Sequence, residues 1–494
     1  MEQRRRSRIV QYLVAASVSL ASLTLGVSST WPTPVLPKLK NINETNVDIN
    51  DQEISWMLAM NSPGFIAGSF ATRFISDRFG RKATILGSAF PMALGTVLLL
   101  FAQKAWLLYV TRFLWGGSTG MIGTVVSMYL AEIADKDIRG TLSVGTRFMF
   151  NLGALLVTAV GPFMSYQTLN SSLVILPVCY FVACWWIPES PYYYLKEGRT
   201  HDAGKTLTKL RSYKDKKEME DELSILQSSV SNEMRRDSSV KELFTGKQYR
   251  SAIIISAGLK LTQIMAGVMA VQHYLGTIMQ DTKAEIKLNT VFIIFGAVRF
   301  VIGIMSSVLA DRVGRRPLLI YSFLGTGICH IIAGAYFFCQ EVLKINQASL
   351  TPYAIIPLIG ILGSSVISTL GFSSIIFVVP AEIFPINIKA VAMASLSIYG
   401  GILGFIVAKF FQDLKDWTGL CGVFWIYSGV AIAGALFSFI YVPETKGKSL
   451  REIQVLLQGD LYDEGDGKLD QVVAKDDHRD TELQELNRRD VSRL

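Results

Sequence analysis

A six-residue stretch occurs twice in this chain and indicates how the chain is built. Residues 77–82 read Asp-Arg-Phe-Gly-Arg-Lys, and residues 311–316 read Asp-Arg-Val-Gly-Arg-Arg. Each copy follows one apolar run and precedes another. A motif repeated at long spacing indicates that one structural unit is used twice. We therefore predict two related halves, each with a charged, tight turn between two apolar helices.

Two further pairs of motifs keep the same order in both halves, which strengthens the repeat. They are Glu132 with Arg139 and Glu382 with Lys389, each pair seven residues apart, and the tripeptides Pro188–Ser190 and Pro443–Thr445. The second half of the chain therefore follows the first from one landmark to the next.

The composition argues against a soluble protein. Half of the 494 residues are apolar, 18% are charged and the mean hydropathy is +0.35, whereas soluble domains carry roughly 25% charged residues. The net charge of +8 comes from Lys and Arg that flank apolar runs, so we expect no nucleic-acid partner. The five cysteines show no metal-ligand spacing. With no nucleophile constellation or phosphate-binding loop either, we expect no enzyme activity, metal or cofactor.

The apolar runs predict an all-α integral membrane protein, with the lipid bilayer as its surroundings. A span needs about 20 mainly apolar residues, and twelve runs qualify. They are residues 10–31, 55–75, 83–102, 106–128, 142–163, 171–187, 251–275, 288–310, 317–339, 352–378, 391–411 and 421–442. Six spans in each half match the repeat, and an even number places both termini on one side.

The distribution of basic residues predicts the orientation. The Arg-rich N-terminus and both repeated loops fall on one face, which the positive-inside rule assigns to the cytoplasm. Two glycosylation sequons, at Asn43 and Asn170, then fall on the outer face of the plasma membrane. The predicted parts are a cytoplasmic N-terminus (1–9), a six-helix bundle (10–195), cytoplasmic linker helices (196–250), a second six-helix bundle (251–445) and a largely disordered cytoplasmic tail (446–494).

The repeated loops predict a set of charge pairs at the cytoplasmic rim. Gly80 and Gly314 permit a tight turn, and charges near the membrane edge are costly unless they are paired. The residues expected to form these gate salt bridges are Asp77, Arg81, Glu132 and Arg139 in the first half, and Asp311, Arg315, Glu382 and Lys389 in the second. The alternative for either loop alone is a basic anchor with a turn.

These motifs together resemble those of the major facilitator superfamily. The Pro-Glu-Ser and Pro-Glu-Thr tripeptides are similar to marks of its sugar porter family, and the segments 151–153 and 409–414 resemble insect facilitated trehalose transporters. The resemblance implies twelve helices in two bundles, a central site and alternating access. It further implies that the charged motifs form cytoplasmic gates rather than the substrate site itself.

The resemblance also implies which residues touch the substrate, and here the chain departs from the family. Sugar porters bind hexoses through polar side chains of several helices, but Ile264 and Met269 stand where the seventh helix usually carries Gln and Asn. The substrate-binding residues expected from the matching positions are Gln263, Gly267, Tyr274, Phe377 and Asn151.

Two further positions carry a positive charge instead of a neutral polar group. Arg299 falls near the middle of the eighth span and Arg147 nearer the cytoplasm in the fifth. An Arg at the bilayer centre costs roughly 3 kcal/mol by insertion scales, so Arg299 is not expected to face lipid. Either it lines the cavity and recognises an anionic or polyol substrate, or it is a structural residue that caps helix carbonyls. For Arg147, a gate or snorkelling role stands beside substrate contact.

We therefore expect a facilitative transporter of a small polyhydroxylated solute, with trehalose or a hexose as the default. Residues 26–31 of the first span contain no acidic group, whereas proton-coupled members of the resembling family carry one there. Two alternatives stay open. One is a carrier of an organic anion or a glycoside that uses Arg299, and the other is a sensor-like protein that does not transport.

Overall fold

Helices make up nearly all of the computed structural model, in which described residues are 2–135, 138–211, 213, 216–235, 240–282, 287–448, 452–453 and 457. The first half contains α1 (Glu2–Thr30), α2 (Pro32–Leu39), α3 (Ile42–Thr45), α4 (Asp51–Ala59), α5 (Asn61–Phe79), α6 (Arg81–Leu100), α7 (Ala105–Ile133), α8 (Arg139–Val160), the 3-10 helix η1 (Gly161–Phe163), α9 (Tyr166–Leu173) and α10 (Ile175–Trp185). Most of the predicted tail, 446–494, lies outside these ranges.

Short helices connect this half to the second one. They are α11 (Pro191–Lys196), α12 (Thr200–Leu210), α13 (Lys216–Arg235), α14 (Val240–Thr245) and η2 (Lys247–Tyr249). The second half contains α15 (Arg250–Met265), α16 (Val268–His273), α17 (Leu275–Asp281), α18 (Leu288–Val313), α19 (Arg315–Glu341), α20 (Gln347–Leu350), η3 (Thr351–Tyr353), α21 (Ile355–Leu370), α22 (Phe372–Ile383) and α23 (Ile386–Tyr441). Within the described ranges, the only β pairing is one bridge between Asp48 and Lys104.

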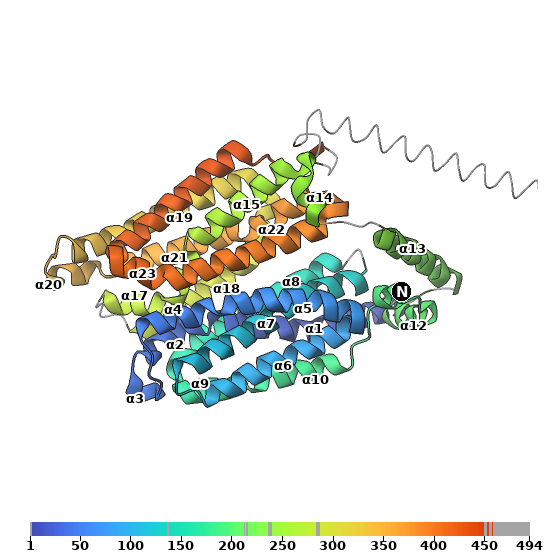
Figure 1. Ribbon diagram of the computed structural model, residues 1–494, viewed down its shortest axis with the longest axis horizontal. Coiled ribbons are helices and arrows are strands. Elements are labelled where there is room, and N and C mark those ends of the chain that lie inside the picture. The colour runs from blue at the N-terminus through green and yellow to red at the C-terminus, as the bar shows by residue number, and fades with distance from the viewer. Residues whose placement is uncertain are drawn as a thin grey trace, which may run out of the picture.

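The two halves form two helical bundles that lie side by side (Figure 1). The bundles approach each other at the end that carries α2, α4 and α17, which we call the closed end. They diverge toward the opposite end, which carries α12, α13 and α14 and which we call the linker end. The N-terminus lies at the linker end as well.

The described helices include nine stretches that are long and apolar enough to cross a membrane. One of them, 391–441, covers the last two expected spans, because α23 continues through a kink where Gly419 leaves helical geometry. Two expected spans, made by α4 with α5 and by α7, are not among the nine. The predicted boundaries of the first span were too short, since helical structure continues through α2 to Leu39.

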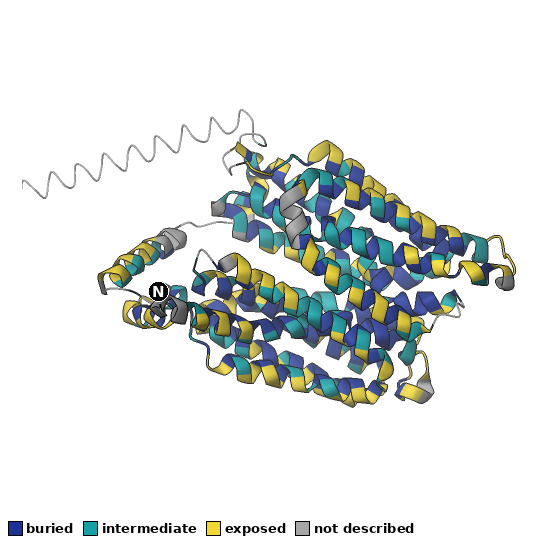
Figure 2. Cartoon of the chain, turned by 180° about the vertical axis from the view of Figure 1, so that it is seen from behind, coloured by how far each residue is buried: buried dark blue, intermediate teal, exposed yellow. Residues whose placement is uncertain are grey.

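Large apolar side chains on the outer faces of the bundles are exposed, as expected for helices that contact lipid. Phe74, Phe90 and Trp185 each expose more than 60% of their surface. Figure 2 shows exposed residues along the outer faces and buried residues where helices meet. This is the reverse of a soluble protein, in which large exposed apolar areas are rare, and it identifies a multi-pass membrane protein.

Glycines at helix contacts explain why two spanning helices are less apolar than the others. In α5 and α7, Gly64 and Gly68 face Phe113 and Gly117 so closely that a Cβ would lie about 2 Å from a carbonyl oxygen of the partner helix. Small residues spaced four apart let membrane helices approach closely, and such packing replaces the hydrophobic effect inside the bilayer. In α5 and α7, glycines that allow close helix contact stand where larger apolar side chains could otherwise lie.

Close contact at glycines also joins α1 to α8. A Cβ on Gly26 would lie 1.9 Å from the Phe150 carbonyl oxygen, and a Cβ on Gly153 would lie 2.1 Å from that of Leu23. Both obstacles belong to the backbone, so a side chain at either position would force the helices apart.

We predict that Gly153→Ala destabilises the protein by about 1–3 kcal/mol, the usual cost of overpacking, because the added methyl group meets the α1 backbone. Gly87→Ala is the matched control, since a Cβ at Gly87 meets nothing within 4 Å. Thermal unfolding of the detergent-purified variants measures the difference. Equal melting temperatures for the two variants would contradict the close α1–α8 contact.

Candidate functional site

The repeated loop of the first half is held by a network of charges at the linker end. Arg81 begins α6 directly after Gly80, whose φ of 95° suits glycine. The Arg81 guanidinium donates to Glu132 of α7 through Nε at 3.1 Å and Nη2 at 3.0 Å. Their side chains are only 8% and 11% exposed. This is a buried ion pair with two parallel hydrogen bonds, the strong geometry for Arg and a carboxylate.

A second carboxylate, that of Glu189, closes the network from the Pro-Glu-Ser motif. It accepts hydrogen bonds from the backbone N–H groups of Arg81, at 2.8 Å, and Lys82, at 3.1 Å. These are free donors at the positive end of the α6 dipole. Burial raises the pKa of the Glu189 carboxyl, although these donors act against the shift. The Ser190 hydroxyl donates in turn to Glu132.

The second half repeats this arrangement with the corresponding residues. Glu444 accepts from the backbone N–H groups of Arg315 and Arg316, at 3.0 and 3.1 Å. The Arg315 Nη2 atom lies 3.0 Å from Glu382, and the Thr445 hydroxyl donates to Glu382 at 2.6 Å. Burial acts to raise the pKa of Glu444, but the backbone donors outweigh it and the pKa is lowered. In the sequence, both tripeptides serve only as markers of the repeat. The sequence alone did not predict that their glutamates accept hydrogen bonds from the first N–H groups of α6 and α19.

These ion pairs join helices of the same bundle. Asp77, which is 46% exposed, lies 2.9 Å from Lys196 and 4.0 Å from Arg81. Lys389 lies in the first turn of α23 and forms no ion pair with a described residue. The side chains of Arg139 and Asp311 lie outside the described part of the structure.

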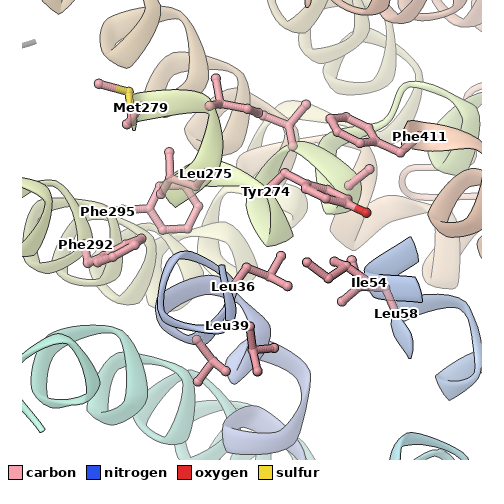
Figure 3. Close-up of a cluster of buried hydrophobic side chains, with 14 of the residues drawn as sticks. Leu36, Leu39, Ile54, Leu58, Tyr274, Leu275, Met279, Phe292, Phe295 and Phe411 are labelled. Atoms are coloured by element: carbon pink, nitrogen blue, oxygen red, sulfur yellow. The ribbon is translucent and has the colours of Figure 1, made fainter. Parts of the chain in front are cut away.

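At the closed end, apolar side chains from both bundles pack against one another. Figure 3 shows Leu36, Leu39, Ile54 and Leu58 of the first bundle facing residues of the second, which include Tyr274, Leu275 and Phe411. Polar contacts reinforce the seam, because Gln52 donates to Asp413 at 2.7 Å and accepts from Lys409 at 3.1 Å. The described contacts therefore close the seam between the bundles at this end.

The seventh span is interrupted between its two helices. Gly267 has a φ of 72° and separates α15 from α16, and a Cβ there would lie 2.2 Å from the Tyr427 ring. A residue with a side chain would therefore not fit at this break in the helix. Tyr274 is 4% exposed and stacks on Phe411 at 4.1 Å, so in this conformation it belongs to the closed seam.

Gln263 and Phe377 lie close to a charged residue that sequence reasoning missed. Lys260 precedes Gln263 by one helical turn on α15, and its Nζ atom lies 4.6 Å from the centroid of the Phe377 ring. The Gln263 Oε1 atom is buried and accepts no hydrogen bond from the described residues. The rule that singled out Arg299, a charge inside an apolar span, applies equally to Lys260.

Arg299 lies beside a small pocket between α1, α8 and α18. Thr30, Asn151 and Thr158 line this pocket, whose free volume of about 10 Å³ has room for one water molecule. The Arg299 Nη1 atom donates to the Oε1 atom of Gln272. The structure therefore brings Arg299 and Asn151, both predicted substrate-binding residues, to one pocket, whereas Arg147 lies on an exposed face of α8.

A further cation inside a spanning helix is Arg112 of α7, in the first bundle. It is 1% exposed, its Nη1 atom donates to the Ser28 carbonyl oxygen at 2.9 Å, and its buried Nε atom has no partner among the residues that the structure describes. His273 lies 3.2 Å from the next carbonyl oxygen, that of Ser29. Sequence reasoning passed over Arg112, although its position inside a span was visible.

The sequon at Asn170 is not a glycosylation site in this fold. Its side chain is 1% exposed, and its Oδ1 atom accepts a hydrogen bond from Trp31 Nε1 at 2.9 Å. A glycan on Nδ2 requires an exposed amide, so this prediction was wrong. The side chain of Asn43 lies outside the described part of the structure.

With the two bundles and their seam described, comparison with known proteins identifies the family. The profile of the sugar (and other) transporter family matches residues 24–457. The chain belongs to this family. A protein named facilitated trehalose transporter Tret1 from Bombyx mori is 32% identical over 453 residues, which are 90% of this chain and 86% of the relative. The Tret1 of Drosophila pseudoobscura pseudoobscura is 31% identical over 91% of this chain.

This sugar transporter family member spans about half the length, 51%, of the Drosophila relative. Among solved structures it is similar to the xylose transporter XylE from E. coli in an inward open conformation, with a TM-score of 0.73 and 21% sequence identity. The alignment covers 90% of this chain and 99% of that structure. XylE bound to 6-bromo-6-deoxy-D-glucose gives a TM-score of 0.71. The fold is therefore the twelve-helix fold of the major facilitator superfamily.

We predict that Arg81→Gln lowers the free energy of unfolding by about 3–5 kcal/mol, the usual cost when a buried ion pair loses one partner. The Glu132 carboxylate would remain buried beside Ser190 alone. Arg78→Gln is the matched control, because Arg78 is an exposed arginine of the same loop, and surface charges contribute roughly 0–1 kcal/mol. Denaturation of the purified variants tests this, and equal loss in both would contradict a structural role for the Arg81–Glu132 pair.

Proposed function

We propose that the protein is a facilitative carrier of a small polyhydroxylated solute, with trehalose or a hexose as the first candidates, and that it works by alternating access. Family membership supports this proposal, as do the relatives that are named facilitated trehalose transporters. The observation that carries it is the seam, which is closed at one end by side chains of both bundles. A carrier of two bundles that rock about a central site needs such a seam.

We infer the orientation from the distribution of charge. The linker end carries the N-terminus, the basic loops and α12–α14, and the positive-inside rule assigns this end to the cytoplasm. We place both termini there, and the closed end then faces outward at the plasma membrane. The structure corresponds in this assignment to an inward-facing conformation. Gln263, Phe377 and Lys260 would then lie on the route from the cytoplasm.

In this proposal the charge networks stabilise each bundle, and they do not themselves open or close the seam. Each one fixes the start of a helix, α6 or α19, to the end of another within the same bundle. A bundle braced in this way moves as one body. The pairs Arg81–Glu132 and Arg315–Glu382 would therefore keep each bundle intact while the seam changes, and the domain boundaries near 195 and 250 separate these bodies.

We predict that the purified protein in liposomes equilibrates radiolabelled trehalose or glucose without accumulating it. No acidic residue lies between Gly26 and Trp31, so a proton gradient has no obvious group through which to act. A pH difference of one unit would drive about tenfold accumulation through a carrier that takes one proton per solute. The expected ratio is one with or without the gradient.

Protein-free liposomes are the control, and exchange of labelled for unlabelled solute distinguishes a carrier from a leak. Accumulation that follows the pH gradient would overturn the facilitative mechanism. Saturable binding of the solute without flux would overturn transport and favour a sensor.

A further inference from the structure

The interior of the spanning helices carries positive charge and no negative charge. Arg112, Arg147, Lys260 and Arg299 lie inside α7, α8, α15 and α18, away from the helix ends. Every Asp and Glu of the spanning helices lies in a first or last turn, or beside the kink at Gly419. Arg112 and Arg299 are therefore separated along their own helices from the nearest acidic residues of those helices.

Lys260 faces the seam between the bundles. Its Cε atom would lie 2.5 Å from a Cβ on Gly400, so the missing side chain of this glycine provides the room for the lysine. The next residue, Gly401, approaches Ile66 of α5 in the other bundle, to 2.7 Å from a built Cβ. Lys260 is thus on the side of α15 and α23 that the first bundle faces, and it is partly exposed.

The Lys260 ammonium group has an aromatic neighbour and no carboxylate. It lies over the exposed Phe377 ring, and no Asp or Glu of the described residues comes within 4.0 Å of it. A cation–π contact is favourable but leaves the charge in place.

Arg299 and Arg112 provide a second group of positive charge farther toward the closed end. Their described hydrogen-bond partners, Gln272 and the Ser28 carbonyl group, are neutral. Gln272 lies 12 residues beyond Lys260 on the seventh span, past the break at Gly267. Positive groups therefore occur at two depths along the seam.

Cations inside a membrane protein are costly, and they commonly face a cavity, pair with other groups and mark the path of a charged substrate. Neutral sugars need hydrogen-bonding groups and not a net charge. We propose that the solute of this carrier is an anion, specifically a sugar acid with one carboxylate. Lys260 pairs with the carboxylate on the cytoplasmic side, and Arg299 with Arg112 does so on the outer side. This inference rests on the proposed function as a carrier.

A sugar acid fits the groups that surround these cations. The Gln263 Oε1 atom, one turn from Lys260, has no partner among the described residues and can accept a hydrogen bond from a hydroxyl group. Asn151, Thr30 and Thr158 offer polar groups beside Arg299. One ammonium group matches one carboxylate. A phosphate ester carries nearly two negative charges. It is therefore included in the test as a comparison and is not the expected substrate.

The test measures flux in liposomes that contain the full chain, with labelled glucuronate, glucose 6-phosphate, glucose and trehalose. Glucuronate is expected to cross faster than the other three. A uniported monoanion also responds to voltage, so about 59 mV of membrane potential changes its accumulation ratio roughly tenfold, whereas the distribution of a neutral sugar does not respond.

Two substitutions connect the effect to Lys260. Lys260→Gln is expected to reduce glucuronate flux about 10- to 100-fold, the loss of one charged hydrogen bond, and to reduce it more than it changes neutral-sugar flux. Lys260→Arg keeps the charge and should retain anion flux, which separates this effect from misfolding. Lys104→Gln is the matched control, because it removes an exposed lysine outside the seam.

The outcomes separate this inference from the proposed function. If neutral sugars cross and glucuronate does not, the charge assignment is overturned and the carrier remains. If glucose 6-phosphate alone crosses, the solute is an anion but the carboxylate assignment is wrong. If chloride accelerates neutral-sugar flux and no organic anion crosses, the cations hold a fixed inorganic ion. If no solute crosses, the proposed function itself fails.

Discussion

A charge that enters the bilayer region must meet an opposite charge or an oriented dipole, because hydrocarbon offers it no solvent. This constraint organises both ends of each bundle. At the linker end, Glu189 and Glu444 receive the free N–H groups at the start of α6 and α19, and Arg81 and Arg315 cross to Glu132 and Glu382. Each network connects the start of one helix to the ends of two others. The charged loop therefore holds three helices of one bundle together in addition to making a turn.

Inside the membrane, helices hold together through close backbone contact. Glycines bring the helix axes so close that backbone carbonyl oxygens occupy the space of a side chain. Gly26 and Gly153 do this between α1 and α8, and Gly64 and Gly68 of α5 do it against α7. Contacts of this kind are rigid, since neither backbone can yield locally. The seam between bundles is different in character, because it consists of side chains such as Leu36, Tyr274 and Phe411 that can separate. Rigid bundles with a separable seam are what alternating access requires.

The residues along the seam differ from the neutral polar set that the family resemblance implies. Family positions that would supply neutral hydrogen-bonding groups are apolar at Ile264 and Met269, and cations appear at Lys260, Arg299 and Arg112. Both changes act in the same direction. They reduce the number of partners for hydroxyl groups and raise the positive potential, so the likeness to trehalose transporters and the charge of the site favour different solutes.

Much of the fold was determined by sequence alone. Apolar runs, the repeated Asp-Arg-x-Gly-Arg motif and the spacing of Glu132 and Glu382 predicted an all-α membrane protein of two six-helix halves, because bilayer thickness sets helix length and burial of charge restricts where motifs can lie. The family resemblance added Arg299 and Asn151, which the structure brings together in one pocket.

Tertiary structure alone decided which groups meet. It showed Glu189 at the start of α6, Tyr274 within the closed seam, and Asn170 buried against Trp31. No local pattern reveals such contacts, since they join segments that are far apart in the chain. Hydropathy places a residue at a depth in the membrane, but only helix packing decides whether it faces lipid, a neighbouring helix or the path of the solute.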